Sequence, residues 1–494
     1  MWKGDGTRMI RTLPKDFCLG AATAAYQVEG ATNADGREPC VWDKWLKRPG
    51  STFDGDKASD FYEHYQKDIE RCQQYNIKML SISFAWTRIM QPDGSVNAAG
   101  LRFYDNVIDA CLQNQVEPFV ALYHFDMPLH LYEKGGWLSP VTTREYLQYV
   151  KICFQHFGSR VKHWITMKDP VLLSRNQYIT GVFPPNRCGD FAKAVQAVHK
   201  MLVAHSKAVL CYGSMNFEGE IGIVHRAEPI YPVADLAINE QAALLDNAYN
   251  NRMVLDAVLK GKYSENTMKL LNSILVQANE SFAPAAEELA VLQEASAQLD
   301  FLGVNYYSSH FCEAYSGANE VHLNDDGQRG TASCNLTGVS RRLKRDDVPT
   351  TDWDWSIFPH GLYDVLMHIK EEYPAKPIYI TEIGLGLKET LVNNTVDDDD
   401  RIDYLRQHLD AVLDAVEDGV KVRGCFVWSL IDAMSWTSGY DKRYGLFYVD
   451  YATQKRYPKK SVKWLRDLAR SRIMLTLNGF QFGENQINTE AESG

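Results

Sequence analysis

Two carboxylates, Asp169 and Glu382, each follow a short apolar run and form a candidate catalytic pair. Hydrolysis of a glycosidic bond needs one carboxyl group to protonate the departing oxygen and a second that attacks the anomeric carbon or activates water. A lone carboxylate is more often a surface charge or a helix cap. The pair therefore indicates glycosidic chemistry only if the fold brings both groups to one site.

Other polar and aromatic residues at the ends of apolar runs have the chemistry to bind a sugar. Amide groups can form hydrogen bonds with neighbouring hydroxyls, and indole rings can stack on a sugar face. Taken singly, each has a simpler explanation; Trp428 alone would be read as a core residue. The candidates are Gln27, His124, Lys168, Asn305, Tyr307 and Trp428, together with Trp436 a little further along the chain.

Eight β-rich apolar runs, separated by helical stretches, are expected to position these residues. Such alternation is typical of parallel βα units, and eight units predict an α/β fold in which one closed (β/α)8 TIM barrel carries its active site at the carboxyl ends of the strands. Asp169 and Glu382 would then end the fourth and seventh strands and face each other across the barrel. The predicted strands are residues 17–22, 79–83, 118–123, 163–167, 221–225, 301–305, 377–381 and 423–428.

Helices and loops of this barrel also leave traces in the sequence. Ile402, Leu405, Leu409 and Val412 form an apolar stripe at helical spacing, which Gly419 ends. The acidic run at 397–400 precedes that stripe and is interpreted as a solvated helix cap. Residues 317–345 are rich in Gly, Asn, Ser and charge, and are predicted to form a long loop at the mouth of the pocket.

Length and composition set limits on the other classes of protein. We expect a single domain over residues 1–494, with the barrel at about 13–475, extended βα loops and short tails at both ends. A net charge of -11 opposes nucleic-acid binding. The sequence contains no run of eighteen apolar residues, so no membrane span is predicted. The first fifteen residues lack the apolar core of a secretory signal, so a cytoplasmic protein is expected. Ten scattered cysteines suggest free thiols; no metal or organic cofactor is predicted, and the oligomeric state is left open.

The sequence resembles glycoside hydrolase family 1 over nearly its whole length. Residues 17–30, FCLGAATAAYQVEG, are similar to the amino-terminal signature of that family, and residues 380–386, ITEIGLG, are similar to its nucleophile motif. The resemblance implies a (β/α)8 barrel that hydrolyses β-glycosides with retention. It implies Glu382 as nucleophile, Asp169 as acid/base, Tyr307 as the residue that positions the nucleophile, and Gln27, His124, Asn305 and Trp428 as sugar-binding residues.

Within this family the likeness is greatest to the 6-phospho-β-galactosidases. It rests on residues 124–126, HFD, on 351–355, TDWDW, and on 435–450, SWTSGYDKRYGLFYVD. In the last stretch Ser435, Lys442 and Tyr444 are donors suited to a phosphate dianion. Without the resemblance, the same stretch would be interpreted as a surface turn that happens to contain a Lys-Arg pair. The resemblance implies that these three residues hold the 6-phosphate, that Ser435 replaces a Glu of non-phosphorylated types, and that Trp436 favours galactose over glucose.

Four of the residues expected at or beside the two carboxylates differ from the family pattern. Lys168-Asp169 stands where the family has Asn-Glu, Ser81 where it has Arg, and Ile383 where it has Asn. Asp169 is one methylene shorter than Glu, and a misplacement of about 1 Å can cost on the order of a hundredfold in rate. Lys168 is predicted to replace the missing Arg as counter-ion of Glu382.

Three functions stay open from the sequence. The first is retaining hydrolysis of 6-phospho-β-galactosides of the phosphorylated-lactose type, and of related 6-phospho-β-glycosides. The second is a catalytically impaired relative that binds phosphorylated sugar, which the Lys168-Asp169 pair favours. The third is a β-glycosidase for unphosphorylated sugars, against which Ser435 and Lys442 speak.

Overall fold

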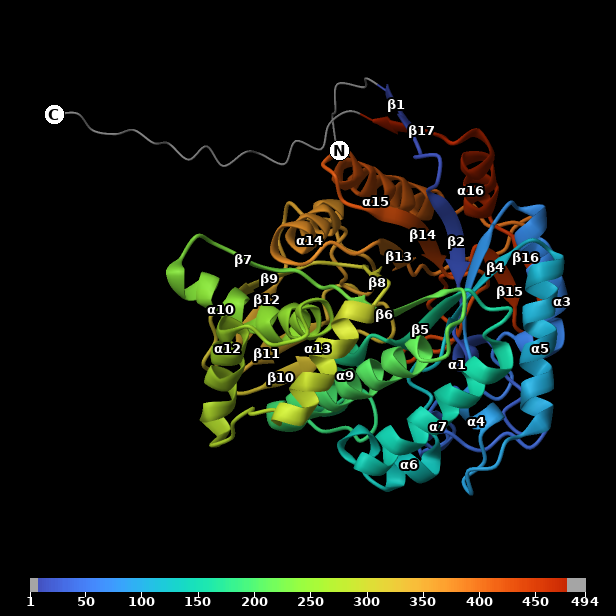
Figure 1. Ribbon diagram of the computed structural model, residues 1–494. Coiled ribbons are helices and arrows are strands. Elements are labelled where there is room, and N and C mark those ends of the chain that lie inside the picture. Colours follow the sequence, from blue (N-terminus) through green and yellow to red (C-terminus); the bar gives the residue numbers. More distant parts are fainter. Residues whose placement is uncertain (1–7, 478–494) are drawn as a thin grey trace.

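Eight parallel strands close into a barrel at the centre of the protein (Figure 1). The computed structural model describes residues 8–477. Every predicted strand is present, so the predicted (β/α)8 fold is confirmed. The strands are apolar along most of their length because helices cover the outer face of the barrel. In barrel order they are β2 (Cys18–Ala22), β3 (Met79–Ser83), β4 (Glu117–Ala121), β5 (His163–Lys168), β6 (Glu220–Arg226), β8 (Phe301–Asn305), β13 (Ile378–Ile383) and β14 (Val422–Trp428).

Side chains fill the interior of the barrel below the strand ends. The rings of Phe119, Tyr379 and Phe426 are buried, and the Phe119 centroid lies 5.1 Å from that of Tyr379 and 4.9 Å from that of Phe426. Phe301 packs against Tyr379 at 5.3 Å. These contacts make a solid floor, so a ligand can enter only from the carboxyl ends of the strands.

Long helices surround the barrel (Figure 1). In α15 the predicted stripe is buried, with Leu405, Leu409 and Val412 at 1% exposure or less, and the chain turns at Gly419 with φ 92°. The principal helices are α3 (Phe61–Gln74), α5 (Ala98–Gln113), α7 (Pro140–Phe157), α9 (Phe191–Gly213), α13 (Ala286–Gln298), α14 (Pro359–Glu372), α15 (Asp399–Glu417) and α16 (Lys460–Ser471). Shorter ones are α1 (Ala25–Val28), α2 (Val41–Trp45), α4 (Trp86–Ile89), α6 (Leu129–Glu133), α8 (Pro170–Ser174), α10 (Ala237–Asn247), α11 (Met253–Leu255) and α12 (Glu265–Leu275).

The segment at 317–345 is not the structureless loop that the sequence predicted. It contributes three of the five strands of a small sheet beside the barrel, whose order is β10-β11-β12-β9-β7 (Figure 1). Strands of three or four residues are too short to show an alternating pattern, which explains the error. The expected position at the mouth of the pocket is nevertheless found, as described below. The strands are β7 (Ile230–Pro232), β9 (His310–Glu313), β10 (Glu320–His322), β11 (Ser333–Leu336) and β12 (Ser340–Leu343).

Two strand pairs complete the fold. The antiparallel pair β1 (Arg8–Thr12) and β17 (Ile473–Leu477) joins the two ends of the described chain, and the hairpin β15 (Phe447–Asp450) and β16 (Lys455–Pro458) follows the last barrel strand. Within residues 8–477, no helix combines the length and the apolar character that crossing a membrane requires.

Candidate active site

One cavity of about 290 Å³ opens at the carboxyl ends of the barrel strands. Of the twelve predicted site residues, ten line it. The other two, Lys168 and Asn305, lie directly behind the lining and contact it through Glu382 and Asp169. The lining residues among those predicted are Gln27, His124, Asp169, Tyr307, Glu382, Trp428, Ser435, Trp436, Lys442 and Tyr444.

Glu382 is held at both of its oxygens. It is the last residue but one of β13 and is 3% exposed. Lys168 Nζ donates to Oε1 at 2.7 Å, and the Tyr307 hydroxyl donates to Oε2 at 2.7 Å. The counter-ion contact predicted for Lys168 is thus present. Ser81, which stands in place of the family's Arg, is buried and brings no charge to the carboxylate.

Asp169 follows β5 directly and turns the chain into α8. Its backbone is left-handed, with φ 50°, which directs the side chain to the cavity at the start of the helix. Asn305 Nδ2 donates to Oδ2 at 2.9 Å, and Thr381 orients that amide by donating to Asn305 Oδ1 at 2.7 Å. Burial and the nearby Glu382 carboxylate raise the pKa of Asp169 to about 7, while the Asn305 hydrogen bond acts in the opposite direction. A carboxyl group whose pKa is raised in this way can hold its proton near neutral pH, as a general acid requires.

The residues expected to bind sugar surround this pair. Gln27 donates through Nε2 to the Met434 carbonyl at 2.6 Å, and its Oε1 is a buried acceptor without a partner among the described residues. The His124 ring lies 6.1 Å from that of Trp428, and burial lowers the pKa of His124 so that the ring is neutral. Asn305 differs from this expectation in one respect: its amide is bound to Asp169 and Thr381 and does not line the cavity.

Lys442 lies in a cage of aromatic rings. Its Nζ is 3.5 Å from the centroid of Trp355, 4.8 Å from that of Trp353 and 5.5 Å from that of Tyr444. The residue is 4% exposed, and no carboxylate of residues 8–477 forms an ion pair with it. Burial and the charge of Arg226 lower the pKa of Lys442 well below its usual range. A buried ammonium without an anion is costly, so this cavity is suited to a ligand that carries one.

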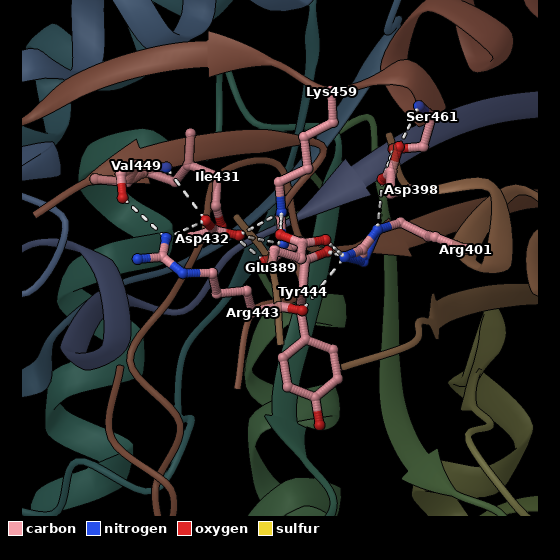
Figure 2. A network of polar contacts seen from close by, with 12 residues as sticks. Glu389, Asp398, Arg401, Ile431, Asp432, Arg443, Tyr444, Val449, Lys459 and Ser461 are labelled. Carbon is pink, nitrogen blue, oxygen red and sulfur yellow. Dashed lines mark hydrogen bonds and ion pairs between the residues drawn. The ribbon is translucent and has the colours of Figure 1, made fainter. Parts of the chain in front are cut away.

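A network of buried charges holds the loop that bears Lys442 and Tyr444 (Figure 2). Asp432 accepts hydrogen bonds from Arg443 Nη1 at 2.6 Å and from Lys459 Nζ at 2.8 Å. It also accepts from the backbone N–H groups of Gly445 at 2.9 Å and Val449 at 3.2 Å. One carboxylate thereby fixes both sides of the turn that follows Lys442.

Arg401 extends this network from α15 (Figure 2). It donates to the Leu385 carbonyl at 2.8 Å and to Asp398 at 3.0 Å, and it pairs with Glu389. Asp398 is 2% exposed and also accepts from Ser461 N at 2.8 Å, so the interpretation of 397–400 as a solvated cap is wrong at this position. Only one of these four identical residues is buried, and nothing in the sequence marks which one.

Several cavity residues were not predicted. Arg226 ends β6, and Glu228 follows two residues later, yet no expectation was attached to the end of the fifth predicted strand. Trp353 and Trp355 belong to the quoted TDWDW motif but had no assigned role. Charged residues directly after a predicted barrel strand were the available signal for Arg226.

The closed barrel with paired carboxylates at the fourth and seventh strands defines the class of (β/α)8 glycoside hydrolases. Residues 9–474 match the family model for Glycosyl hydrolase family 1, and the chain belongs to that family.

Relatives of known name cover almost the whole chain. A 6-phospho-beta-galactosidase from Clostridium acetobutylicum is 46% identical over 471 residues, which are 95% of this chain and 99% of the relative. One from Streptococcus mutans is 45% identical over 94% of this chain and 100% of the relative. Among solved structures, a family 1 b-glucosidase from Thermotoga maritima is 33% identical with a TM-score of 0.83, covering 94% of this chain and 99% of its own. A GH1 beta-glucosidase from Exiguobacterium antarcticum is 32% identical with a TM-score of 0.85 over 94% and 99% of the two chains.

Proposed function

We propose that this protein hydrolyses 6-phospho-β-galactosides with retention of configuration. The observation that carries the proposal is the buried Lys442 ammonium, which faces the cavity beside Ser435 and Tyr444 without a carboxylate partner among the described residues. A phosphate group on the sugar supplies the missing anion. The names of the relatives at 44 to 46% identity support the same substrate class.

In the first step Glu382 attacks the anomeric carbon. Its carboxylate forms the bond to the sugar while the bond to the leaving oxygen breaks and Asp169 transfers its proton to that oxygen. In the second step Asp169, now ionised, takes a proton from water as the water oxygen attacks the anomeric carbon and releases Glu382. The raised pKa of Asp169 supports its role as the acid, and the hydrogen bonds from Lys168 and Tyr307 hold the Glu382 carboxyl group in place for its role as the nucleophile.

The remaining side chains of the cavity orient the substrate. Gln27, His124 and Trp428 face the sugar, and Ser435, Lys442 and Tyr444 face its phosphate. Trp436 lines the same cavity and discriminates galactose from glucose; its stacking on Tyr26 at 5.7 Å holds the ring in place. Asn305 and Lys168 act one layer further out, on Asp169 and Glu382.

A protein that binds phosphorylated sugar and hydrolyses it slowly is the second candidate. The Lys168-Asp169 pair favours it, because Lys168 replaces the amide that the family pattern has directly before its acid. The shorter Asp169 side chain acts in the same direction. A β-glycosidase for unphosphorylated sugars leaves the charge of Lys442 without a partner and is disfavoured.

Hydrolysis of 2-nitrophenyl β-galactoside with and without a 6-phosphate tests the proposal. We expect kcat/KM to be at least about a hundredfold higher for the phosphorylated substrate, since a charge-assisted contact contributes about 1.5 to 3 kcal/mol and three donors surround the phosphate. Equal rates would overturn the substrate assignment. Binding of galactose 6-phosphate without turnover of either substrate would favour the second candidate.

A further inference from the structure

Arg226 is a cation of the cavity that the proposed reaction has not used. Its guanidinium carbon lies 4.7 Å from the ring centroid of Tyr307 and 5.0 Å from that of Trp355. The same two rings also contact the groups of the proposed reaction: the Tyr307 hydroxyl donates to Glu382, and Trp355 is the ring nearest to the Lys442 ammonium. Arg226, Asp169 and Lys442 line the same cavity, and the Trp355 ring centroid lies 5.0 Å from Arg226 Cζ and 3.5 Å from Lys442 Nζ.

Charges around Arg226 do not balance. Glu228 lies with Oε1 2.7 Å from Arg226 Nε, but the same carboxylate also pairs with Arg175 and lies 4.0 Å from Arg342. Asp246, 3.5 Å from Arg342, is the second anion of this group. His310 adds no charge at neutral pH, because burial lowers its pKa to about 4. The cations are Arg175, Arg226, Arg342 and Lys442, and the anions are Glu228 and Asp246, with Asp169 counted as uncharged because the proposed acid is protonated before the reaction.

Two positive charges of this group are therefore left for a ligand once Lys442 is protonated. The neighbouring Lys344 and Asp354 form a pair of their own and change nothing in this count. A phosphate monoester carries a charge of about −1.5 to −2 at pH 7. The Lys442 ammonium neutralises only one of the two negative charges of a phosphate dianion. A second cation of the cavity is needed to neutralise the other.

The shape of the substrate brings its phosphate to this wall. In a β-pyranoside the C1–O bond and the C6 arm flank the ring oxygen, so the leaving oxygen and a 6-phosphate lie at one edge of the sugar. Asp169 serves the leaving oxygen and Lys442 serves the phosphate. Arg226 lines the same cavity as both residues and shares the Trp355 ring with Lys442.

Building on the proposed function, we infer that Arg226 is a second phosphate-binding cation, which shares the dianion with Lys442 and contributes to the preference for phosphorylated substrates. Its planar guanidinium offers two parallel donors to phosphate oxygens, which an ammonium cannot. Glu228 and the rings of Tyr307 and Trp355 hold it in place before the substrate arrives.

The test compares Arg226→Gln with the wild type in two assays. In the first, kcat/KM is measured for 2-nitrophenyl β-galactoside with and without the 6-phosphate. In the second, inhibition constants are measured for galactose 6-phosphate and for galactose, which have no leaving group. We expect Arg226→Gln to weaken the phosphorylated member of each pair by about 10- to 100-fold and the other member by less than about threefold. Arg226→Lys should recover part of the loss, because it keeps the charge and loses the paired donors.

A matched control removes a neighbouring positive charge outside the cavity. Arg341 on β12 is exposed and pairs with Glu313, so Arg341→Gln should leave both ratios unchanged. Circular dichroism and the melting temperature of each variant exclude loss of the fold, and Arg226→Lys serves if Arg226→Gln does not fold.

Three outcomes would overturn the inference. If Arg226→Gln slows both substrates equally, leaves the inhibition by galactose 6-phosphate unchanged and shifts the pH profile, Arg226 acts through Asp169. If the wild type prefers the phosphorylated substrate and the variant keeps the whole preference, only the role of Arg226 is wrong. If the wild type itself shows no preference in either assay, the proposed function fails and the role of Arg226 fails with it.

Discussion

Lys168 Nζ lies 2.7 Å from Glu382 Oε1, and both side chains are at most 4% exposed. A charge relationship of the family is thus kept by a different residue on a different strand: the cation has moved from β3, where Ser81 now stands, to the end of β5. The exchange preserves a positive charge beside the proposed nucleophile, although it gives up the amide that precedes the acid in the family pattern.

Breaking this pair should destabilise the protein strongly. Lys168→Met leaves the Glu382 carboxylate buried beside an apolar chain, and we expect the free energy of unfolding in urea to fall by about 3 to 5 kcal/mol. The double variant Lys168→Met/Glu382→Gln removes both charges and should recover most of the loss. Lys44→Met is the control, because Lys44 pairs with Glu133 at 2.8 Å with both side chains more than half exposed and water screens that pair. Equal losses for the two single variants would contradict the assignment of the buried pair.

The pH dependence of kcat/KM should follow the proton of Asp169. The proposed acid donates only when protonated, so kcat/KM falls as the pH rises through its pKa, which burial and Glu382 raise to about 7. Asn305→Ala removes a donor that stabilises the ionised form, so the pKa of Asp169 rises further and the falling limb should move up by about 0.5 to 1 pH unit. Thr381→Val removes the hydrogen bond that orients the Asn305 amide but keeps the amide itself, so it should move the falling limb by less. A limb that moves to lower pH would argue against this role for Asn305.

Lys442→Met should separate recognition from stability. The variant loses the cation for phosphate, and KM for the phosphorylated galactoside should rise about 10- to 100-fold with little change for the unphosphorylated one. Because burial lowers the pKa of Lys442, the folded state disfavours the charged form at neutral pH, and removing it should raise the melting temperature of the free protein. Lys388→Met is the control: Lys388 lies 5.8 Å from the Trp353 ring but does not line the cavity. A fall in both affinity and stability would indicate that Lys442 has a structural partner.

Trapping should identify the nucleophile directly. A 2-fluoro galactoside 6-phosphate with a good leaving group forms the glycosyl ester but hydrolyses slowly, and peptide mass mapping should find the label on Glu382. Glu382→Gln should abolish hydrolysis, because the amide forms no such ester. A label on any other residue would refute the assignment.

Restoring the family residues should show what the departures cost. A retracted acid helps least when the departing oxygen is most basic, so nitrophenyl substrates should react much faster than phosphorylated lactose. Asp169→Glu should narrow that gap. Lys168→Asn alone should reduce activity, since no other cation of residues 8–477 is hydrogen-bonded to Glu382. If the triple variant Ser81→Arg, Lys168→Asn, Asp169→Glu is no faster than the wild type on the lactose substrate, the departures do not impair the chemistry.

The barrel was predictable because its strands repeat one simple pattern. The barrel strands are buried on both faces, so each appears in the sequence as a continuous apolar run. A polar residue follows the run, such as Asp169 after β5 or Ser429 after β14. That marking also located most residues of the cavity. The small sheet beside the barrel was missed because β10, β11 and β12 have only three or four residues each, too few to show a strand pattern.

Buried charge was the other feature that the sequence concealed. Asp398 has the same side chain as Asp397 and Asp399 but is buried at the start of α15. Arg226 differs from a surface arginine only because the rings of Tyr307 and Trp355 lie against it. Both depend on contacts between residues far apart in the chain. Residue type and spacing cannot report such contacts without the fold.

Two separate sets of side chains have different roles in and around the loop after β14. Asp432, Arg443 and Lys459 bind one another and the backbone, whereas Ser435, Lys442 and Tyr444 face the cavity. The frame is therefore independent of the groups that meet the ligand. We therefore expect single substitutions at Ser435 or Lys442 to change the charge that faces the cavity while the Asp432 frame keeps the loop in place.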